Sequence, residues 1–263
     1  MSDRLEGKVV FITGAARGQG REHVLRMAQE GAAVVAVDIQ NPADPSTDFA
    51  QTVAEATHRG YRILARECDV RNGDELTRAA QEGFELFGRI DTLVANAAVL
   101  AQPHPLLDVS MDTFRQTMDV NVYGVWHSCR AVIPFILKGA RGGSIIITNS
   151  VLGLKAALMA FEYTVSKHAL VGMMKAMALE LAPHSIRVNS IHPTTVDTPM
   201  LQSLRPAKLS AREHAATLLS FNALPVPWVE AADVSSAAIF LASDESRYVT
   251  GATLPVDAGA LLK

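Results

Sequence analysis

A tyrosine and a lysine stand four residues apart in the second half of the chain, at Tyr163 and Lys167. Side chains at this spacing lie on one face of a helix, so the phenol and the ammonium would be neighbours. An ammonium about 4 Å away stabilises a phenolate by roughly 4 kcal/mol at an effective dielectric constant of about 20. That would bring the pKa of Tyr163 toward neutrality, where general acid–base catalysis works best. Tyr–Lys pairs at this spacing are also common on exposed helix surfaces, where they have no catalytic role. The other residues that could join the pair decide between the two interpretations.

Two further polar residues could serve the same reaction. Ser150 follows the apolar run 144–148, where a strand would end, and its hydroxyl could reach the same reacting oxygen as Tyr163. Asn121 interrupts an apolar helical stretch, and a buried amide must find hydrogen-bond partners. The predicted catalytic set is therefore Asn121, Ser150, Tyr163 and Lys167.

A second group of residues could hold a dinucleotide. Three glycines, Gly14, Gly18 and Gly20, follow the apolar run 9–13 and open a helical pattern. Glycines let backbone N–H groups approach a pyrophosphate, and the helix N-terminus favours its charge. Asp38 ends the next apolar run, where a carboxylate can accept hydrogen bonds from ribose hydroxyls. An ordinary strand–helix turn could also carry three glycines, but Asp38 in register favours the cofactor interpretation.

Apolar runs and helical patterns alternate along the chain. Further strands are predicted at 34–37, 63–70, 92–95, 144–148 and 186–191, and helices at 49–58, 77–87, 111–137 and 163–181, with Pro134 as a late kink or stop. Strands that are apolar on both faces are typical of a parallel sheet covered by helices. We predict an α/β fold: one doubly wound Rossmann-type domain over 1–263, with about seven parallel strands and helices on both faces.

Two segments interrupt this alternation. The loop 39–48 is rich in turn-forming residues and should lie over the mouth of the cofactor crevice. The segment 198–227 is long, carries alternating charges, and contains Met200, Leu201 and Phe221. It follows the carboxyl end of a strand, where open α/β sheets bind ligands, so we interpret it as a substrate lid. The alternative is that this segment is an exposed surface insertion without a role in substrate binding.

Composition excludes several classes of function. The 263 residues carry a net charge of −3 without a basic stripe, so nucleic acid is not an expected partner. No apolar run is long enough for a membrane span, and the charged N-terminus has no signal-peptide core. Cys68 and Cys129 lie in apolar segments and fit buried thiols of a cytoplasmic protein better than a disulfide. No metal site is predicted.

The chain resembles the short-chain dehydrogenase/reductase family over nearly its whole length. The resemblance is carried by Thr13-Gly14-x-x-x-Gly18-x-Gly20, Asp38, Asp69-Val70, Asn96-Ala97-Ala98, Asn121, Ser150, Tyr163-x-x-x-Lys167 and Asn189-x-x-x-Pro193. Two positions depart from the usual pattern, because Ala98 and Thr194 stand where the family commonly has glycine. Neither belongs to the acid–base set, so the implied reaction type is unchanged.

The resemblance implies a role for each matched residue. Tyr163 would be the acid–base and Ser150 would polarise the substrate oxygen. Lys167 would lower the pKa of Tyr163 and bind the nicotinamide ribose, and Asn121 would hold a water in a proton relay. Asp69 and Val70 would contact the adenine, and Val196 and Thr198 the nicotinamide carboxamide. The full implied cofactor set is Gly14, Arg17, Gly18, Gln19, Gly20, Asp38, Ile39, Asp69, Val70, Asn96, Ala97, Ala98, Tyr163, Lys167, Pro193, Val196 and Thr198.

The residues of three motifs indicate a particular subgroup of this family. The stretches 14–21, 192–200 and 254–259 are similar to those of mycofactocin-associated, carveol dehydrogenase-like members. That subgroup implies a small, largely apolar secondary alcohol or its ketone as substrate, and NAD that stays bound while an external electron acceptor reoxidises it. A freely exchanging NAD remains open. We expect NAD rather than NADP, because Asp38 would face a 2′-phosphate, although Arg17 could pair with one.

Alternatives to this enzyme remain. One is an NAD-binding redox sensor without catalysis, which would not need the acid–base residues found here. An epimerase usually carries a further substrate domain, and an enoyl reductase should have a wider spacing between Tyr and Lys, so both are less expected.

A homotetramer is expected from the helix 163–181, which is apolar on more than one side. There Val165, Ala169, Met173, Ala176 and Met177 could face the sheet, and Leu170, Met174, Ala178 and Leu181 a partner subunit.

Overall fold

Parallel strands form the centre of the computed structural model, which describes residues 3–263. Over that range one sheet has seven strands in the order β3-β2-β1-β4-β5-β6-β7, all pairs being parallel. The strands are β1 Val9–Thr13, β2 Ala33–Asp38, β3 Ile63–Glu67, β4 Thr92–Ala95, β5 Gly143–Thr148, β6 Ile186–Pro193 and β7 Thr253–Val256. Every residue of β1 is buried, as expected of an apolar strand covered on both sides.

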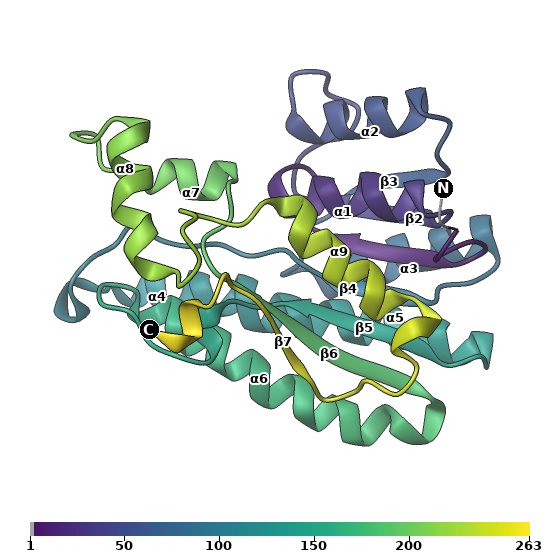
Figure 1. Ribbon diagram of the computed structural model, residues 1–263. Helices are drawn as coiled ribbons and strands as arrows, with labels where there is room; N and C mark the ends of the chain where they lie inside the picture. The colour runs from purple at the N-terminus through teal and green to yellow at the C-terminus, as the bar shows by residue number, and fades with distance from the viewer. Residues whose placement is uncertain (1–2) are drawn as a thin grey trace.

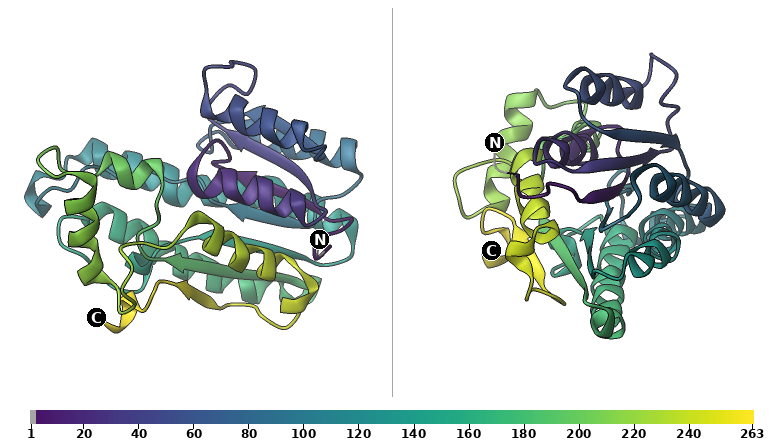
Figure 2. Two further views of the ribbon diagram at one scale, coloured as in Figure 1. Left: turned by 45° about the horizontal axis from the view of Figure 1, so that its top comes forward. Right: turned by 90° about the vertical axis from the view of Figure 1, so that its right-hand side faces the viewer.

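Helices cover both faces of this sheet (Figures 1 and 2). The helices of the main body are α1 Gly18–Gln29, α2 Asp48–His58, α3 Gly73–Phe87, α4 Met111–Met118, α5 Gly124–Gly139, α6 Phe161–Leu181 and α9 Ala231–Ala242. One core joins the sheet to α3, α5 and α6, and a second core joins it to α1, α2 and α9. The predicted fold class, a doubly wound α/β domain, is confirmed.

The strand order reverses between β1 and β4, which are neighbours in the sheet but are separated in the chain by β2 and β3. At such a point the connections leave in opposite directions, and a crevice opens beyond the carboxyl ends of the strands. The glycine-rich turn after β1 and the residues after β4 meet there. This topology therefore locates the candidate site before any side chain is considered.

The predicted helix 111–137 has a more complex form. It is divided by a π-helical segment, Asp119–Tyr123, which contains Asn121, and it continues through Pro134 to Gly139. A hydrophobic period of 3.6 residues does not reveal one wider turn, and Pro134 is tolerated inside the helix. Of the two expectations for Pro134, a kink or a stop, the stop is wrong, because α5 continues to Gly139. Single π-helical turns are frequent at functional sites.

Two other expectations need correction. The strand predicted at 63–70 ends at Glu67, the last residue of β3 that pairs with β2. The two faces of α6 are interchanged for most residues: Leu170, Met174 and Ala178 are buried in the core with Met177, whereas Ala176 is exposed. Both faces are apolar, so the pattern alone did not distinguish them.

The segment 198–227 leaves the sheet and forms two short helices, α7 Pro199–Ser203 and α8 Ala211–Leu218. They lie at the same end of the molecule as the C-terminus (Figure 1). A bridge between Val196 and Val229 closes the base of the segment. Gln102 donates a hydrogen bond to the Ser203 carbonyl at 3.0 Å and so joins the segment to the loop after β4.

Cys68 and Cys129 are buried free thiols, as predicted, and burial raises the pKa of each to about 12. Among residues 3–263, no helix is long and apolar enough to cross a membrane. The same range contains no cluster of three or more His, Cys, Asp or Glu side chains that could hold a metal ion.

Candidate active site

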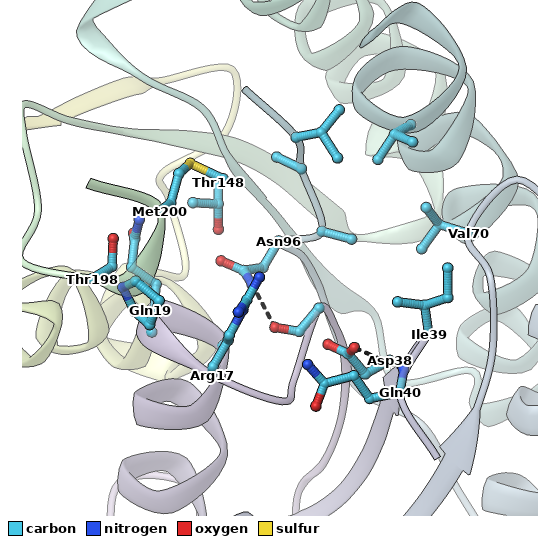
Figure 3. Close-up of a pocket in the computed structure, with 18 of the residues that line it drawn as sticks. Arg17, Gln19, Asp38, Ile39, Gln40, Val70, Asn96, Thr148, Thr198 and Met200 are labelled. Carbon is cyan, nitrogen blue, oxygen red and sulfur yellow. Dashed lines mark hydrogen bonds between the residues drawn. The ribbon is translucent and has the colours of Figure 1, made fainter. Parts of the chain in front are cut away.

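A cleft of about 350 Å³ opens at the carboxyl ends of β1 and β4. It is lined by Gly14, Arg17, Gly18, Gln19, Gly20, Asp38, Ile39, Gln40, Cys68, Asp69, Val70, Arg71, Asn96, Ala97, Ala98, Val99, Gln116, Val120, Thr148, Asn149, Tyr163, Lys167, Thr198, Pro199 and Met200. Gln19, Thr198 and Met200 lie at one end in Figure 3, and Asp38, Ile39 and Gln40 at the other. We call the second the Asp38 end. We call the first the Tyr163 end, because Thr148 lies near Met200 in Figure 3 and its carbonyl accepts from Lys167, which is adjacent to the Tyr163 ring.

The glycines of the first turn are required by close backbone approaches. A Cβ at Gly20 would lie 1.8 Å from the Gly14 carbonyl oxygen, and one at Gly14 would lie 2.8 Å from Ala97 Cα. Gly14 also has a φ of +65°, which side chains other than glycine rarely adopt. The turn is therefore tightly packed, and Gly14, Gly18 and Gly20 line the cleft at the N-terminus of α1, where backbone N–H groups can receive an anion. We call this turn the glycine cradle.

Asn96 holds this cradle in place. Its amide donates hydrogen bonds to the carbonyl oxygens of Thr13 and Gly14, both at 3.1 Å. The Thr13 hydroxyl in turn accepts from the backbone N–H groups of Asn96 and Ala97. These bonds join the end of β1 to the end of β4, so Asn96 organises the turn in addition to lining the cleft.

Asp38 ends β2 with its carboxylate directed to backbone donors. One oxygen accepts from the Ala16 N–H at 2.9 Å and the other from the Gln40 N–H at 3.1 Å. Each carboxylate oxygen keeps a further lone pair for another donor. Arg17, the candidate partner of a 2′-phosphate, instead lies 3.7 Å from the Asp48 carboxylate and is largely exposed.

Asp69 and Arg71 form the wall beyond Asp38. Their side chains make a bidentate ion pair, and the pKa of Asp69 is lowered chiefly by this hydrogen bonding. The backbone N–H of Asp69 donates to Glu75 at 2.9 Å. Val70 lines the cleft beside them, with Ile39 63% exposed nearby on the same wall. The Asp38 end is therefore a half-open surface with paired charges.

At the opposite end, Tyr163 and Lys167 occupy successive turns of α6 and are both buried. The Lys167 ammonium lies 5.4 Å from the centroid of the Tyr163 ring and donates to the Thr148 carbonyl at 3.0 Å. Ser150 lies two residues beyond β5, and its hydroxyl favours the ionised form of the phenol. Tyr163 and Lys167 line the cleft, whereas Ser150 follows Asn149 of the wall and is not itself a lining residue.

The electrostatics differ from the expectation drawn from spacing. Burial raises the pKa of Tyr163 to about 12, and the hydrogen bond from Ser150 opposes this. Burial also lowers the pKa of Lys167 to about 8. The spacing argument treated the pair as two charges at close range, but removal from water has the largest effect on Tyr163, and it raises the pKa of the phenol. Additional positive charge in the cleft would be needed to make the phenol acidic near neutral pH.

Two buried residues fix the backbone around Ser150. Asn149 accepts from the Ser150 N–H at 2.9 Å and donates to the Lys167 carbonyl at 3.1 Å. The His192 ring contacts the Ser150 carbonyl through Nδ1 at 2.7 Å and the Ser190 hydroxyl through Nε2 at 2.7 Å. Burial lowers the pKa of His192 to about 4, so the ring is neutral at physiological pH. Neither residue was predicted as part of the site.

Asn121 is fully buried inside the π-helical segment, behind the wall of the cleft. Its side-chain oxygen accepts from the Val99 N–H at 2.8 Å, and its amide donates to the Val99 carbonyl and the Ser166 hydroxyl. The prediction that this amide must have partners is confirmed. The side chain fixes the loop after β4 against α6.

Several predicted residues do not reach the cleft, and several unpredicted ones do. Pro193 pairs with Val256 at the end of β6, and Val196 is buried at its bridge with Val229, so neither lines the wall. Met200, which was predicted only as part of the substrate lid, also lines this wall. Thr148 lines the wall and was not predicted, although its place at a strand end, directly before Asn149 and Ser150, could have indicated a lining role.

Fold and cleft together define an α/β dinucleotide-binding protein with a buried tyrosine–lysine pair at its switch point. Residues 14–260 match the family described as "Enoyl-(Acyl carrier protein) reductase". The (−)-trans-carveol dehydrogenase of Rhodococcus erythropolis is 42% identical over 275 residues, covering 99% of this chain and 99% of the relative. The chain belongs to the short-chain dehydrogenase/reductase family.

Solved structures are similar over the whole chain. Carveol dehydrogenase from Mycobacterium avium, solved in complex with NAD, is 44% identical with a TM-score of 0.93 and covers 99% of each chain. A short-chain dehydrogenase from Mycobacterium paratuberculosis, bound to NAD, is 42% identical with a TM-score of 0.87. That match covers 99% of this chain and 100% of the other.

Proposed function

We propose that this chain is an NAD-dependent oxidoreductase that interconverts a small, largely apolar secondary alcohol, of terpenoid or carveol-like character, and its ketone. The observation that carries the proposal is the buried Tyr163–Lys167 pair in the wall of the cleft at the switch point of the sheet, with the Ser150 hydroxyl beside the phenol. Membership of the short-chain dehydrogenase/reductase family supports the reaction class. The named relative supports the class of alcohol.

The residues of the cleft fit NAD. The glycine cradle has no room for a Cβ at Gly14 or Gly20 and suits a pyrophosphate. Asp38 keeps acceptor capacity for ribose hydroxyls, and its charge disfavours a 2′-phosphate. Two buried oxygens on the wall, Gln19 Oε1 and Thr148 Oγ1, have no hydrogen-bond partner among the described residues. Both are available to a polar group of a bound ligand.

Bound NAD supplies the hydride acceptor in alcohol oxidation and the hydride donor in ketone reduction. Tyr163 takes the hydroxyl proton of the alcohol or returns it to the ketone oxygen. Ser150 donates a hydrogen bond to that oxygen, which orients it and stabilises its negative character. The positive charges of Lys167 and of the oxidised cofactor both favour the phenolate, opposing the effect of burial on Tyr163. Asn121 would hold a relay water with its remaining lone pair.

The surroundings of the Tyr163 end favour an apolar substrate. Met200 lies at this end (Figure 3), and Val99 and Val120 also line the cleft. Beside it, the His104 N–H donates to the Met159 carbonyl, which joins the loop after β4 to the loop before α6. Leu158 is 95% exposed in that second loop. The segment 198–227 completes the enclosure as the proposed lid.

The test is a substrate panel. Purified protein is incubated with NAD⁺ and a series of secondary alcohols, from cyclohexanol to carveol, and reduced cofactor is followed at 340 nm. An enoyl thioester with NADH tests the activity in the name of the matched family. Oxidation of apolar alcohols, absent in Tyr163→Phe, supports the proposal. Turnover of the thioester alone would replace it, and no turnover with any substrate would favour a catalytically silent NAD-binding module.

Cofactor exchange is a separate proposal. We propose that NAD stays bound through turnover and that an external electron acceptor reoxidises it, with the lid covering the Tyr163 end. At the Asp38 end, Ile39 and Gln40 line the cleft, whereas the residues after them form a loop closed by bonds of Thr47 to the Asn41 and Asp44 carbonyls. Protein purified without added NAD should retain it in near-stoichiometric amount. Cofactor-free protein with saturable NAD⁺ kinetics would contradict this.

We also propose a homotetramer. On α6, Val165 and Ala169 are half-buried and lie outside the core, and α5 exposes Trp126. Apolar helix surfaces of this kind are commonly covered by a partner subunit. Sedimentation at micromolar concentration should give the tetramer mass, and a monomer would contradict the proposal.

A further inference from the structure

A second cavity, of about 240 Å³, lies at the opposite edge of the sheet, where β1, β4, β5 and β6 begin. This edge is on the same side of the molecule as the marked N-terminus in Figure 1, far from α7 and α8. No residue of this cavity belongs to the cleft that holds Tyr163 and Asp38. Any ligand here would therefore be separate from the substrate and the cofactor.

The cavity is strongly cationic. It is lined by two carboxylates, Asp91 and Asp244, and by five cationic side chains, Lys8, Arg89, Arg141, Arg187 and Arg247, an excess of three positive charges. The whole chain has a net charge of −3, so this concentration does not reflect the average composition. A cavity lined by one sign of charge concentrates ions of the opposite sign.

The two carboxylates are already occupied. Lys8 pairs with Asp244 at 2.6 Å, and Arg89 pairs with Asp91 at 2.5 Å. Asp91 also accepts from the Val9 N–H at 2.8 Å. Across residues 3–263, no ion pair is formed by Arg141 or Arg247, and Arg247 instead lies 5.1 Å from the Tyr248 ring. The positive excess is thus available to a ligand.

Arg187 is the most constrained of these cations. Its guanidinium donates to three backbone carbonyls, those of Leu241, Ser243 and Val249. Neutral carbonyls satisfy the N–H groups but do not neutralise the charge. Burial lowers the pKa of Arg187, and the charge of Asp244 only partly opposes this. A nearby anion would compensate a charge that the protein has taken out of water.

Thr92 provides an independent indication of a ligand. This residue is 1% exposed, lines the cavity, and has a side-chain hydroxyl without a hydrogen-bond partner among the described residues. A buried hydroxyl normally has a partner, because leaving one unpaired costs about 1–3 kcal/mol. In cationic surroundings, its natural role is to donate to an oxyanion.

We propose that this cavity binds a doubly charged tetrahedral oxyanion, either inorganic phosphate or the phosphoryl group of a small phosphomonoester. The cationic excess supplies the charge, Thr92 supplies a neutral donor, and arginine is well suited to phosphate oxygens. The volume is below the roughly 300–1,000 Å³ of sites for drug-sized ligands, which favours a small anion. Binding of an anion in this cavity does not depend on the proposed dehydrogenase activity or on which alcohol is the substrate.

The experiment is calorimetric titration of the NAD-saturated protein with inorganic phosphate and, separately, with glycerol 3-phosphate. Saturating NAD occupies the glycine cradle, so that phosphate does not bind there. Ionic strength is held constant with chloride. We expect saturable binding of at least one of the two, which also distinguishes the free ion from the monoester. Heat no greater than that of a matched phosphate-free chloride titration would overturn the proposal.

Variants locate the site. Thr92→Val keeps the shape of a buried strand residue and removes only the hydroxyl, and Arg247→Gln removes one unpaired charge. Each should weaken binding by about tenfold, and chloride-only thermal unfolding verifies that both fold. Arg78→Gln is the matched control, because Arg78 is an exposed arginine on α3 outside this cavity. Equal binding by all variants, or equal weakening by Arg78→Gln, would contradict the assignment.

Discussion

The two ends of the cleft are built by different physical means. At the Tyr163 end, Tyr163, Lys167 and His192 are buried, and Asn149 and His192 hold the backbone around Ser150 by hydrogen bonds. At the Asp38 end, Ile39 is exposed, and the charges of Asp69 and Arg71 are paired in contact with solvent. One end is rigid and desolvated, and the other is half-open.

This difference separates catalysis from cofactor selection. Proton transfer requires groups held within a narrow geometry in a region without bulk water, which burial provides. Selection between NAD and NADP requires only that one ribose position meets a suitable charge, which a half-buried carboxylate such as that of Asp38 can provide. We therefore expect substitutions at the Tyr163 end to change rate and stability strongly, and those at the Asp38 end to change mainly cofactor preference.

The sharpest test of this comparison is Tyr163→Phe. The ring and its packing remain and only the proton-transferring hydroxyl is lost, so kcat should fall by at least about a hundredfold while NAD affinity changes little. Stopped-flow turnover and calorimetric NAD binding measure the two quantities. Lys167→Ala should impair both, because the ammonium serves the phenol and the cofactor. Retention of more than about a hundredth of the wild-type rate in Tyr163→Phe would exclude Tyr163 as the base.

The second prediction concerns the stability cost of burial around Ser150. Burial lowers the pKa of His192 from 6.5 to about 4, so the unfolded chain binds more protons between these values. Stability from this group is complete above pH 6.5 and is lost as pH falls toward 4, by about 3 kcal/mol. His192→Asn keeps a donor for the Ser150 carbonyl and cannot titrate, so its unfolding free energy should fall less with acid.

The measurement is urea unfolding at several pH values from 7 to 4.5. His184→Asn serves as the control, because His184 is exposed and lies outside the cleft, and it should leave the pH dependence unchanged. His23 is also buried with its pKa lowered to about 4, so some acid sensitivity should persist in His192→Asn. An unchanged pH dependence in His192→Asn would show that His192 is not a source of acid instability.

A smaller effect is expected at the Asp38 end. Asp38→Asn keeps an oxygen for the Ala16 N–H and removes the charge, so the preference for NAD over NADP should fall by about tenfold with little change in kcat. Steady-state kcat/KM with both cofactors measures this. Equal or better efficiency of the wild-type protein with NADP would contradict the role of Asp38. A large fall in kcat would contradict the proposed separation of the two ends.

Sequence reasoning succeeded where a local pattern determines the structure. Apolar runs located β1, β4 and β5 closely, and the helix stop at Gly88 follows from its left-handed φ of +76°. The start of α3 was missed by four residues, although Asn72 caps it by accepting from the N–H groups of Asp74 and Glu75. That capping signal was readable from the sequence.

What could not be predicted depends on contacts between distant segments. His192 meets the Ser150 carbonyl only because β5 and β6 are neighbours in the sheet. The pKa of Tyr163 depends on burial, which helical spacing does not report, so the expected effect of Lys167 was overstated. The π-helical turn around Asn121 also leaves no trace in a hydrophobic period, because one wider turn barely shifts the apolar pattern.

The smallest predicted effect distinguishes two glutamines of the cleft. Gln19 lies near Thr198 and Met200 at the Tyr163 end, and its buried side-chain oxygen has no partner in the described part of the chain (Figure 3). Gln40 lies at the Asp38 end, and its side-chain oxygen accepts from the Phe49 N–H at 3.1 Å. An unpaired buried acceptor is costly in the free protein and becomes useful when a bound cofactor offers an N–H group.

Gln19→Leu should therefore leave the NAD-free protein equally or more stable, while NAD binds about threefold to tenfold more weakly, the range of one hydrogen bond. Gln40→Leu should instead lower the stability of the NAD-free protein, because it leaves the Phe49 N–H without its partner. Thermal unfolding of both NAD-free variants and calorimetric NAD titration measure the contrast. If Gln19→Leu destabilised the NAD-free protein and left NAD affinity unchanged, the Gln19 side-chain oxygen would be a structural acceptor. The Tyr163 end would then not offer this unpaired acceptor to the cofactor.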